Sequence, residues 1–173
     1  MESGNISRKP REILKTLAIG RKPARTLRRI AVTALICIIV FRFFLIPARL
    51  HGTSMEPAYR HGSVNFINTF AYRTAEPRRG DVVGINLAGR MVMLFKRIIG
   101  LPGEKLGFEN GHLIINGEPF QEPYLNAESD WDMPEVEIGR GEYFVAGDNR
   151  RMPIENHELG RVDRRRITGK AVF

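Results

Sequence analysis

The sequence has 173 residues, enough for one domain and a short additional segment, and its formal net charge is +8. The excess charge lies in residues 1–29, which hold nine Lys/Arg against two Asp/Glu, whereas residues 30–173 hold eighteen against seventeen. No aromatic residue lies among the basic ones in 1–29, so this charge argues against a nucleic-acid surface, and we expect no nucleic-acid partner.

An apolar run follows the basic segment. Residues 30–41 carry no charge, Arg42 interrupts the run, and Pro47 ends it. As a helix, residues 30–46 would be about 25 Å long, at the short end of the range for crossing a bilayer. We therefore predict a transmembrane anchor over 30–46. A cleaved signal peptide is the alternative, but residues 46–48 lack the small-x-small pattern of a cleavage site.

The charge distribution predicts the orientation of this anchor. Basic segments beside a membrane-spanning helix stay on the cytoplasmic side. Residues 1–29 would then form a cytoplasmic tail, and residues 48–173 would form a domain outside, close to the lipid bilayer. The expected location is the plasma or inner membrane, crossed once.

Short apolar runs separated by Gly, Pro and Asn follow residue 48, a pattern typical of strands. Asn-Gly pairs at 110–111 and 116–117 predict hairpins, and hence a small meander over 105–121. Residues 122–139 are acidic and contain proline, so we expect a loop there. The fold class is therefore all-β, as a compact antiparallel sheet or barrel-like domain. The other predicted strands are 64–67, 81–85, 91–99, 142–146 and 167–173.

Two segments carry side chains that could act together in catalysis. A turn of small residues at 52–57 presents Ser54, and the apolar run 91–99 contains Lys96. A serine hydroxyl needs a base to become nucleophilic, and a lysine can serve as that base when burial disfavours its charged form. The simpler alternatives are an ordinary turn before Pro57 and a lysine whose amine reaches solvent.

Strand alternation favours burial of the lysine. Side chains two residues apart share a face of a strand, so Val92, Leu94 and Ile98 would surround Lys96. An aliphatic environment of this kind lowers the pKa of a lysine. The sequence thus predicts a basic amine within hydrogen-bond reach of Ser54, if the two segments meet.

Four segments follow the single anchor in order: Gly-x-Ser-Met-x-Pro at 52–57, Gly-Asp-Val-Val at 80–83, Lys-Arg-Ile-Ile-Gly-Leu-Pro-Gly-Glu at 96–104 and Gly-Asp-Asn-Arg at 147–150. Together they resemble the conserved segments of bacterial type I signal peptidases. The resemblance covers residues from about 27 to 173, and the short 122–139 segment is similar to the compact, single-anchor members. It implies the fold of that family and a serine endopeptidase without cofactor or metal. Its substrates would be exported preproteins cleaved after a small-x-small pattern.

The resemblance also implies roles for individual residues. Ser54 would be the nucleophile and Lys96 the general base, in the Ser-Lys variant of serine protease chemistry. The Ser54 backbone N–H would bind the oxyanion. Some members add a serine hydroxyl at the position of Gly52, where this chain has no side-chain donor. Met55 would line the pocket for the small residue at the cleavage point.

The chain departs from the family pattern after residue 150. Asp148 and Arg150 would be structural supports that hold the last strand against the site. Pro153 replaces a serine that commonly hydrogen-bonds the lysine, Glu155 replaces an aspartate, and His157 replaces an arginine. Glu155 could pair with Arg150 or His157. Lys96 would then lack its usual hydroxyl partner, which affects rate or specificity more than fold.

One alternative to Lys96 as the base and two alternatives to a general signal peptidase remain. His51 lies three residues before Ser54 and could form a Ser-His dyad, although such a histidine rarely folds back far enough. The altered segment 151–157 suits a specialised peptidase for one substrate, such as a conjugation or pilus precursor. A catalytically weak, membrane-bound binding module is the third, and the presence of both Ser54 and Lys96 argues against it. No histidine shows metal-ligand spacing.

Overall fold

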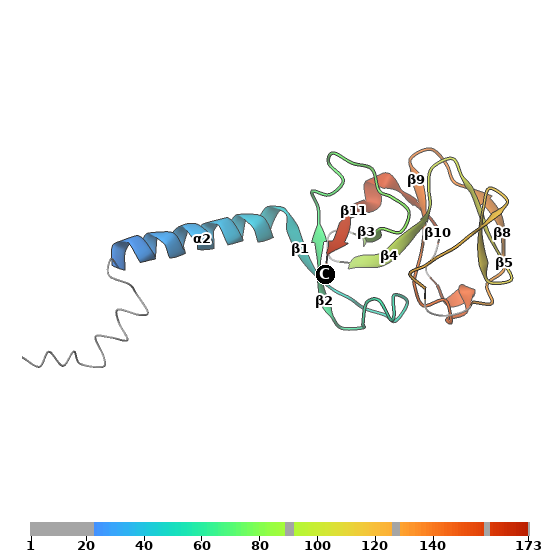
Figure 1. Ribbon diagram of the computed structural model, residues 1–173, viewed down its shortest axis with the longest axis horizontal. Helices are drawn as coiled ribbons and strands as arrows, with labels where there is room; N and C mark the ends of the chain where they lie inside the picture. The colour runs from blue at the N-terminus through green and yellow to red at the C-terminus, as the bar shows by residue number, and fades with distance from the viewer. Residues whose placement is uncertain (1–22, 89–91, 126–128, 158–159, 173) are drawn as a thin grey trace, which may run out of the picture. The chain divides into compact units, whose positions relative to one another are not determined.

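The computed structural model describes residues 23–88, 92–125, 129–157 and 160–172 (Figure 1). An α-helix precedes a domain of antiparallel strands with two short 3-10 helices. The elements are α2 (Pro23–Phe43), β1 (Leu45–Arg49), β2 (Val64–Asn68), β3 (Val82–Ala88), β4 (Val92–Gly100), β5 (Lys105–Glu109), β6 (His112–Ile115), β7 (Glu118–Phe120), β8 (Met133–Glu137), β9 (Glu142–Ala146), η1 (Ile154–Asn156), β10 (Gly160–Asp163), η2 (Arg164–Arg166) and β11 (Ile167–Val172).

The chain divides into two compact units, residues 1–42 and 43–173. Helix α2 exposes apolar side chains along most of its length, from Leu27 to Phe41. Within the described part of the chain, no helix is both long enough and apolar enough to cross a bilayer. The predicted C-terminal boundary of the apolar helix was wrong, because the helix ends at Phe43 and residues 45–46 begin strand β1. The predicted tail mostly lies outside the described residues.

A seven-stranded antiparallel sheet organises the second unit, in the order β1-β2-β11-β3-β4-β9-β10. The last strand, β11, lies between β2 and β3 and is therefore an internal strand of the sheet. Strand β4 is also internal, with Lys96 opposite Val83 of β3 and Arg97 opposite Ala146 of β9. Internal strands have their backbone groups paired on both sides, which fixes the position of each side chain. The structure is therefore mostly β, with antiparallel sheets as predicted.

A second sheet of four strands has the order β7-β6-β5-β8, and β5 and β8 lie side by side in Figure 1. The hairpin prediction is confirmed, since Asn110 and Asn116 have φ of 48° and 53° and each is followed by a glycine with positive φ. This is the conformation that Asn-Gly hairpins require. The predicted loop over 122–139 was wrong in part, because Met133–Glu137 forms β8 and pairs with β5. Its acidic side chains are exposed, which hid the strand pattern.

Alternate side chains of β4 enter different hydrophobic clusters, as the alternation predicts. Leu94 and Ile98 pack with Val83 in one cluster. Phe95 packs in another cluster with Met55, which follows the Ser54 turn. The strand that carries Lys96 therefore packs against the turn that carries Ser54.

Candidate active site

The structure brings Ser54 and Lys96 together. Lys96 lies on β4 and is only 1% exposed, so the alternative of a solvated lysine is contradicted. Its Nζ donates a hydrogen bond to Ser54 Oγ at 3.0 Å. Ser54 is partly buried. A hydroxyl and an amine at this distance, in a largely apolar environment, have the geometry of a nucleophile and its base.

The turn that presents Ser54 is held locally by backbone hydrogen bonds. Gly52 has φ of +95°, a conformation that side chains disfavour, and its N–H donates to His61 Nδ1 at 3.0 Å. Glu56 N–H donates to the Thr53 carbonyl at 3.1 Å. Gly52 thus serves the shape of the turn. The sequence offered no signal for the contribution of His61, which is nine residues away.

A segment after β9 holds the same turn from the other side. Asn149 N–H donates to the Ser54 carbonyl at 2.9 Å, and the Asn149 side chain donates to the Thr53 carbonyl at 3.1 Å. A β-carbon at Gly147 would collide with the Ser54 carbonyl oxygen. The glycine of the Gly-Asp-Asn-Arg segment therefore permits a close backbone approach, and the asparagine fixes it.

A cavity of about 450 Å³ opens beside the Ser54–Lys96 pair. Met55 contributes to its lining and is itself 1% exposed, which places its bulk against the cavity. Met55 therefore contributes a buried thioether to the wall of this cavity. The lining residues are 50–55, 93–96, Met152 and Asn156.

Asp148 binds β4 through Arg97, the residue next to Lys96. Arg97 Nε and Nη2 donate to the two carboxylate oxygens of Asp148 at 2.7 and 2.6 Å. The guanidinium also lies over the Tyr124 ring, 4.1 Å from its centroid. Burial opposes the charge of Arg97, but the bonds to Asp148 outweigh it and the pKa of Arg97 is raised. Asp148 thus contacts β4, whereas the resemblance implied a contact with the last strand.

Arg150 has a partner that the sequence did not suggest. It is fully buried, and its Nη1 and Nη2 donate to the carboxylate of Glu122 at 2.6 Å each. Its Nε donates to the Gly147 carbonyl at 3.0 Å. The expected pairing of Glu155 is not found among the described residues, where Glu155 is exposed in η1. Glu122 is one of several acidic residues in its segment, and no local pattern distinguishes it.

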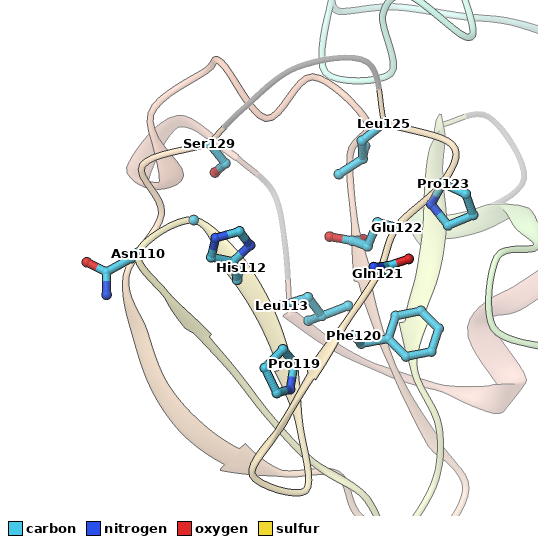
Figure 2. Close-up of a pocket in the computed structure, with 11 residues that line it drawn as sticks. Asn110, His112, Leu113, Pro119, Phe120, Gln121, Glu122, Pro123, Leu125 and Ser129 are labelled. Atoms are coloured by element: carbon cyan, nitrogen blue, oxygen red, sulfur yellow. The ribbon is translucent and has the colours of Figure 1, made fainter.

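Glu122 also borders a second cavity, of about 770 Å³, near the four-stranded sheet. Figure 2 shows its side chain among those of Leu113, Phe120 and Leu125. Tyr124 donates to the Glu122 carboxylate at 2.6 Å, and burial together with this carboxylate raises the pKa of Tyr124. The loop bearing Glu122 is thereby tied to Arg150.

The histidines near the site contact groups other than the Ser54 hydroxyl. His51 is exposed and its ring packs against His61, with centroids 6.2 Å apart, so the Ser-His alternative lacks support. His157 is buried, and its Nε2 donates to the Asn149 carbonyl at 2.8 Å. Burial lowers the pKa of His157. Among the described residues no cluster of three or more His, Cys, Asp or Glu could hold a metal ion.

Comparison with known proteins gives the same family for the whole arrangement. The family model of signal peptidase, peptidase S26, matches residues 24–173. Signal peptidase IB of Staphylococcus aureus is 33% identical over 162 residues, covering 83% of this chain and 84% of that protein. Signal peptidase I of Bacillus licheniformis is 32% identical over 157 residues, covering 84% of each.

A crystal structure of a signal peptidase I from Enterococcus faecalis is also similar, with 26% identity and a TM-score of 0.44. The match spans 56% of this chain and 97% of the Enterococcus faecalis chain. The family model and the two sequence relatives favour neither the specialised peptidase nor the inactive binding module. The chain therefore belongs to the signal peptidase family, peptidase S26, and is a serine endopeptidase that removes signal peptides.

Proposed function

We propose that this signal peptidase cleaves preproteins with Ser54 as nucleophile and Lys96 as general base. The observation that carries the proposal is the 3.0 Å hydrogen bond between Lys96 Nζ and Ser54 Oγ, made by a lysine that is 1% exposed. Burial disfavours the ammonium form of a lysine, so a neutral amine becomes available as a base. With the amine neutral, the Ser54 hydroxyl donates to Nζ across the same 3.0 Å, which gives the serine proton its path to the base.

Acylation follows from this geometry. Ser54 Oγ attacks the carbonyl carbon of the scissile bond while its proton passes to Lys96 Nζ. The Ser54 backbone N–H donates to the oxyanion that forms. As the tetrahedral intermediate collapses, the Lys96 ammonium gives its proton to the leaving amine. The mature protein departs, and the signal peptide remains as an ester on Ser54.

In deacylation, water replaces Ser54 as the nucleophile, and Ser54 Oγ becomes the leaving group. Neutral Lys96 takes a proton from a water molecule that attacks the ester carbonyl. The ammonium then returns the proton to Ser54 Oγ, and the signal peptide leaves as a carboxylic acid. One amine thus serves as base and acid in both halves of the reaction.

The substrates are exported preproteins, and we propose that the cleaved bond follows a small-x-small pattern. Met55 is buried against the cavity beside Ser54, which limits the depth available to a side chain. An extended substrate can pair with a strand edge and place alternate side chains in shallow pockets. Efficient cleavage after leucine or phenylalanine would contradict this specificity.

We further propose that α2 holds the protein at a membrane with residues 48–173 on the outer side. The helix exposes apolar side chains from Leu27 to Phe41, and Arg28 and Arg29 near its start have long side chains that can reach the interface. The basic excess before residue 30 favours a cytoplasmic N-terminus. Protease added to spheroplasts should digest the domain and spare an N-terminal tag; digestion of the tag alone would reverse the orientation.

The decisive test of function is cleavage of a preprotein by purified protein in detergent. Wild type should release the mature protein, and sequencing of its new N-terminus should place the cut after a small residue. The Ser54→Ala variant should release none. Release by Ser54→Ala at the wild-type rate would overturn the assignment of the nucleophile.

A further inference from the structure

His157 is a buried titratable side chain beside the site that the proposed mechanism does not use. It is 7% exposed, and its ring meets Trp131 edge to face, with centroids 4.5 Å apart and an interplanar angle of 69°. Its Nε2 lies 2.8 Å from the Asn149 carbonyl oxygen, so this nitrogen carries the proton. Within the described residues, Nδ1 is buried without a hydrogen-bond partner.

Asn149 connects this imidazole to the nucleophile. Its carbonyl accepts from His157, its N–H donates to the Ser54 carbonyl at 2.9 Å, and its side chain donates to the Thr53 carbonyl at 3.1 Å. A β-carbon at Gly147 would lie 2.8 Å from His157 Cε1 and would also collide with the Ser54 carbonyl oxygen. The ring, the 147–149 segment and the Ser54 turn are therefore packed in direct succession.

We propose that His157 is a positioning residue for Ser54, which acts through Asn149 and does so only as a neutral imidazole. This inference rests on the proposed function, because it names the residue that holds the proposed nucleophile, Ser54, in place. It gives the departure from the family pattern at residue 157 a defined role.

The surroundings of His157 disfavour a second proton. The charged groups that face it are Lys96 from β4 and Arg150 from the segment after β9, and Trp131 contributes an aromatic ring. Burial lowers the pKa of His157, the bond to Asn149 opposes this, and the charges of Lys96 and Arg150 lower it further. Protonation would place a charge on an Nδ1 that has no acceptor, beside two cationic groups.

The lowered pKa fixes the direction of the pH effect. The unfolded chain binds a proton at about pH 6.5, whereas the folded chain binds it only at lower pH. The stability that neutral His157 contributes is therefore complete above about pH 6.5 and is lost as the pH falls from there through the folded pKa. Below that range the support of the Ser54 turn should fail.

This failure has a kinetic signature. If Lys96 is the base, log(kcat/KM) falls with slope one as the pH drops below the lysine pKa. Protonation of His157 adds a second required deprotonation, so the slope should increase to two at a pH below about 6.5. A purely structural side chain that does not titrate would leave the slope at one.

Two substitutions separate the hydrogen bond from the titration. In His157→Gln, the side-chain amide reaches the position of Nε2, can donate to the Asn149 carbonyl, and does not titrate. In His157→Asn, the shorter amide reaches only the position of Nδ1. At pH 8 we expect kcat of His157→Gln within about threefold of wild type, and that of His157→Asn about 10- to 100-fold lower with little change in KM.

The pH series completes the test with two controls. Wild type should show the slope of two, and His157→Gln should keep a slope of one to the lowest pH at which it remains folded. His112→Gln, on the exposed surface of β6, should behave as wild type. His61→Ala removes the acceptor for Gly52 N–H and should still show the steeper slope.

A measurement that needs no activity keeps this inference separate from the proposed function. The Tm of the Ser54→Ala variant should fall between pH 7 and pH 5. In the double variant Ser54→Ala, His157→Gln, the Tm should fall less over the same range. Any of three results would overturn the role of His157. The slope of two could persist in His157→Gln, it could be absent in His61→Ala, or His157→Gln and His157→Asn could have equal kcat. Cleavage by Ser54→Ala would instead overturn the proposed function and leave the unfolding comparison in force.

Discussion

Ser54 and Lys96 are held by different kinds of structure. Lys96 belongs to an internal strand, paired on both sides and buried among apolar side chains. Ser54 belongs to a turn whose residues 51–53 are exposed and whose carbonyl groups are bound by Asn149. The base is positioned by sheet register, and the nucleophile is positioned by polar contacts from distant segments.

This difference separates two properties of the site. Changes on β4 should act mainly on the basicity of Lys96, because the apolar environment controls its charge. Changes around the turn should act mainly on geometry, because a small displacement of a nucleophile lowers the rate without altering a pKa. Each of the following experiments breaks or sharpens this division.

The largest effect is expected from removing the pair itself. Ser54→Ala and Lys96→Ala should each lower kcat/KM for preprotein cleavage by about 10⁴-fold or more, and the double variant should be no worse than either single one. Residues that act as one unit show this non-additivity. If Lys96→Ala kept most activity while His51→Ala lost it, the base would have been assigned wrongly.

The next largest effect concerns the support behind the turn. Glu122→Gln leaves the guanidinium of Arg150 fully buried without its charged partner. Breaking a buried ion pair costs roughly 3–5 kcal/mol, so the free energy of unfolding should fall by about that amount. Glu118→Gln, on the exposed strand β7, is the matched control and should change it little. Equal stability of the two variants would contradict a supporting role for Glu122.

The same division explains which parts of the structure the sequence could predict. The strand with Lys96 and its burial follow from side-chain alternation, and the Asn-Gly hairpins follow from local turn chemistry. Strand β8 was missed because its alternation is weak and its acidic residues are exposed. The apolar residues 45–46 were assigned to the anchor, because apolar runs alone do not distinguish helix from strand.

The contacts of the turn could not be predicted from sequence patterns. The Arg150–Glu122 pair joins residues 28 positions apart, and Asn149 reaches Thr53 over 96 positions. Such pairs depend on the tertiary fold and leave no local periodicity. The resemblance to signal peptidases indicated that Asp148 and Arg150 are supports, but it did not identify their partners.

A smaller effect, confined to basicity, is expected on β4. Leu94 is partly buried and lines the cavity with Lys96. In Leu94→Gln, a polar group beside the amine stabilises the ammonium form and raises the lysine pKa. The neutral amine then requires a higher pH, so the acid limb of the kcat/KM profile should move upward. Leu125→Gln, at the second cavity, should leave the profile unchanged; a shift in both, or in neither, would contradict control of Lys96 by its apolar neighbours.

The smallest effect is expected at Pro153, where the sequence and the structure lead to different predictions. The family pattern places a serine here that binds the lysine, so the sequence alone predicts that Pro153→Ser modestly raises turnover. In the structure Pro153 is exposed, and the residues around it that line the cavity are Met152 and Asn156. A hydroxyl at 153 would meet solvent, so kcat should stay within about twofold of wild type.

Met152→Ser is the informative partner of this experiment, because it places the same hydroxyl on the cavity lining. It also removes an apolar group beside the site, so it should move the pH profile upward as Leu94→Gln does. Faster cleavage by Pro153→Ser would mean that the segment before η1 turns residue 153 toward Lys96 during the reaction. Unchanged cleavage would mean that β4 alone sets the orientation of the amine. The sheet would then position the base entirely, while polar contacts position the nucleophile on its turn.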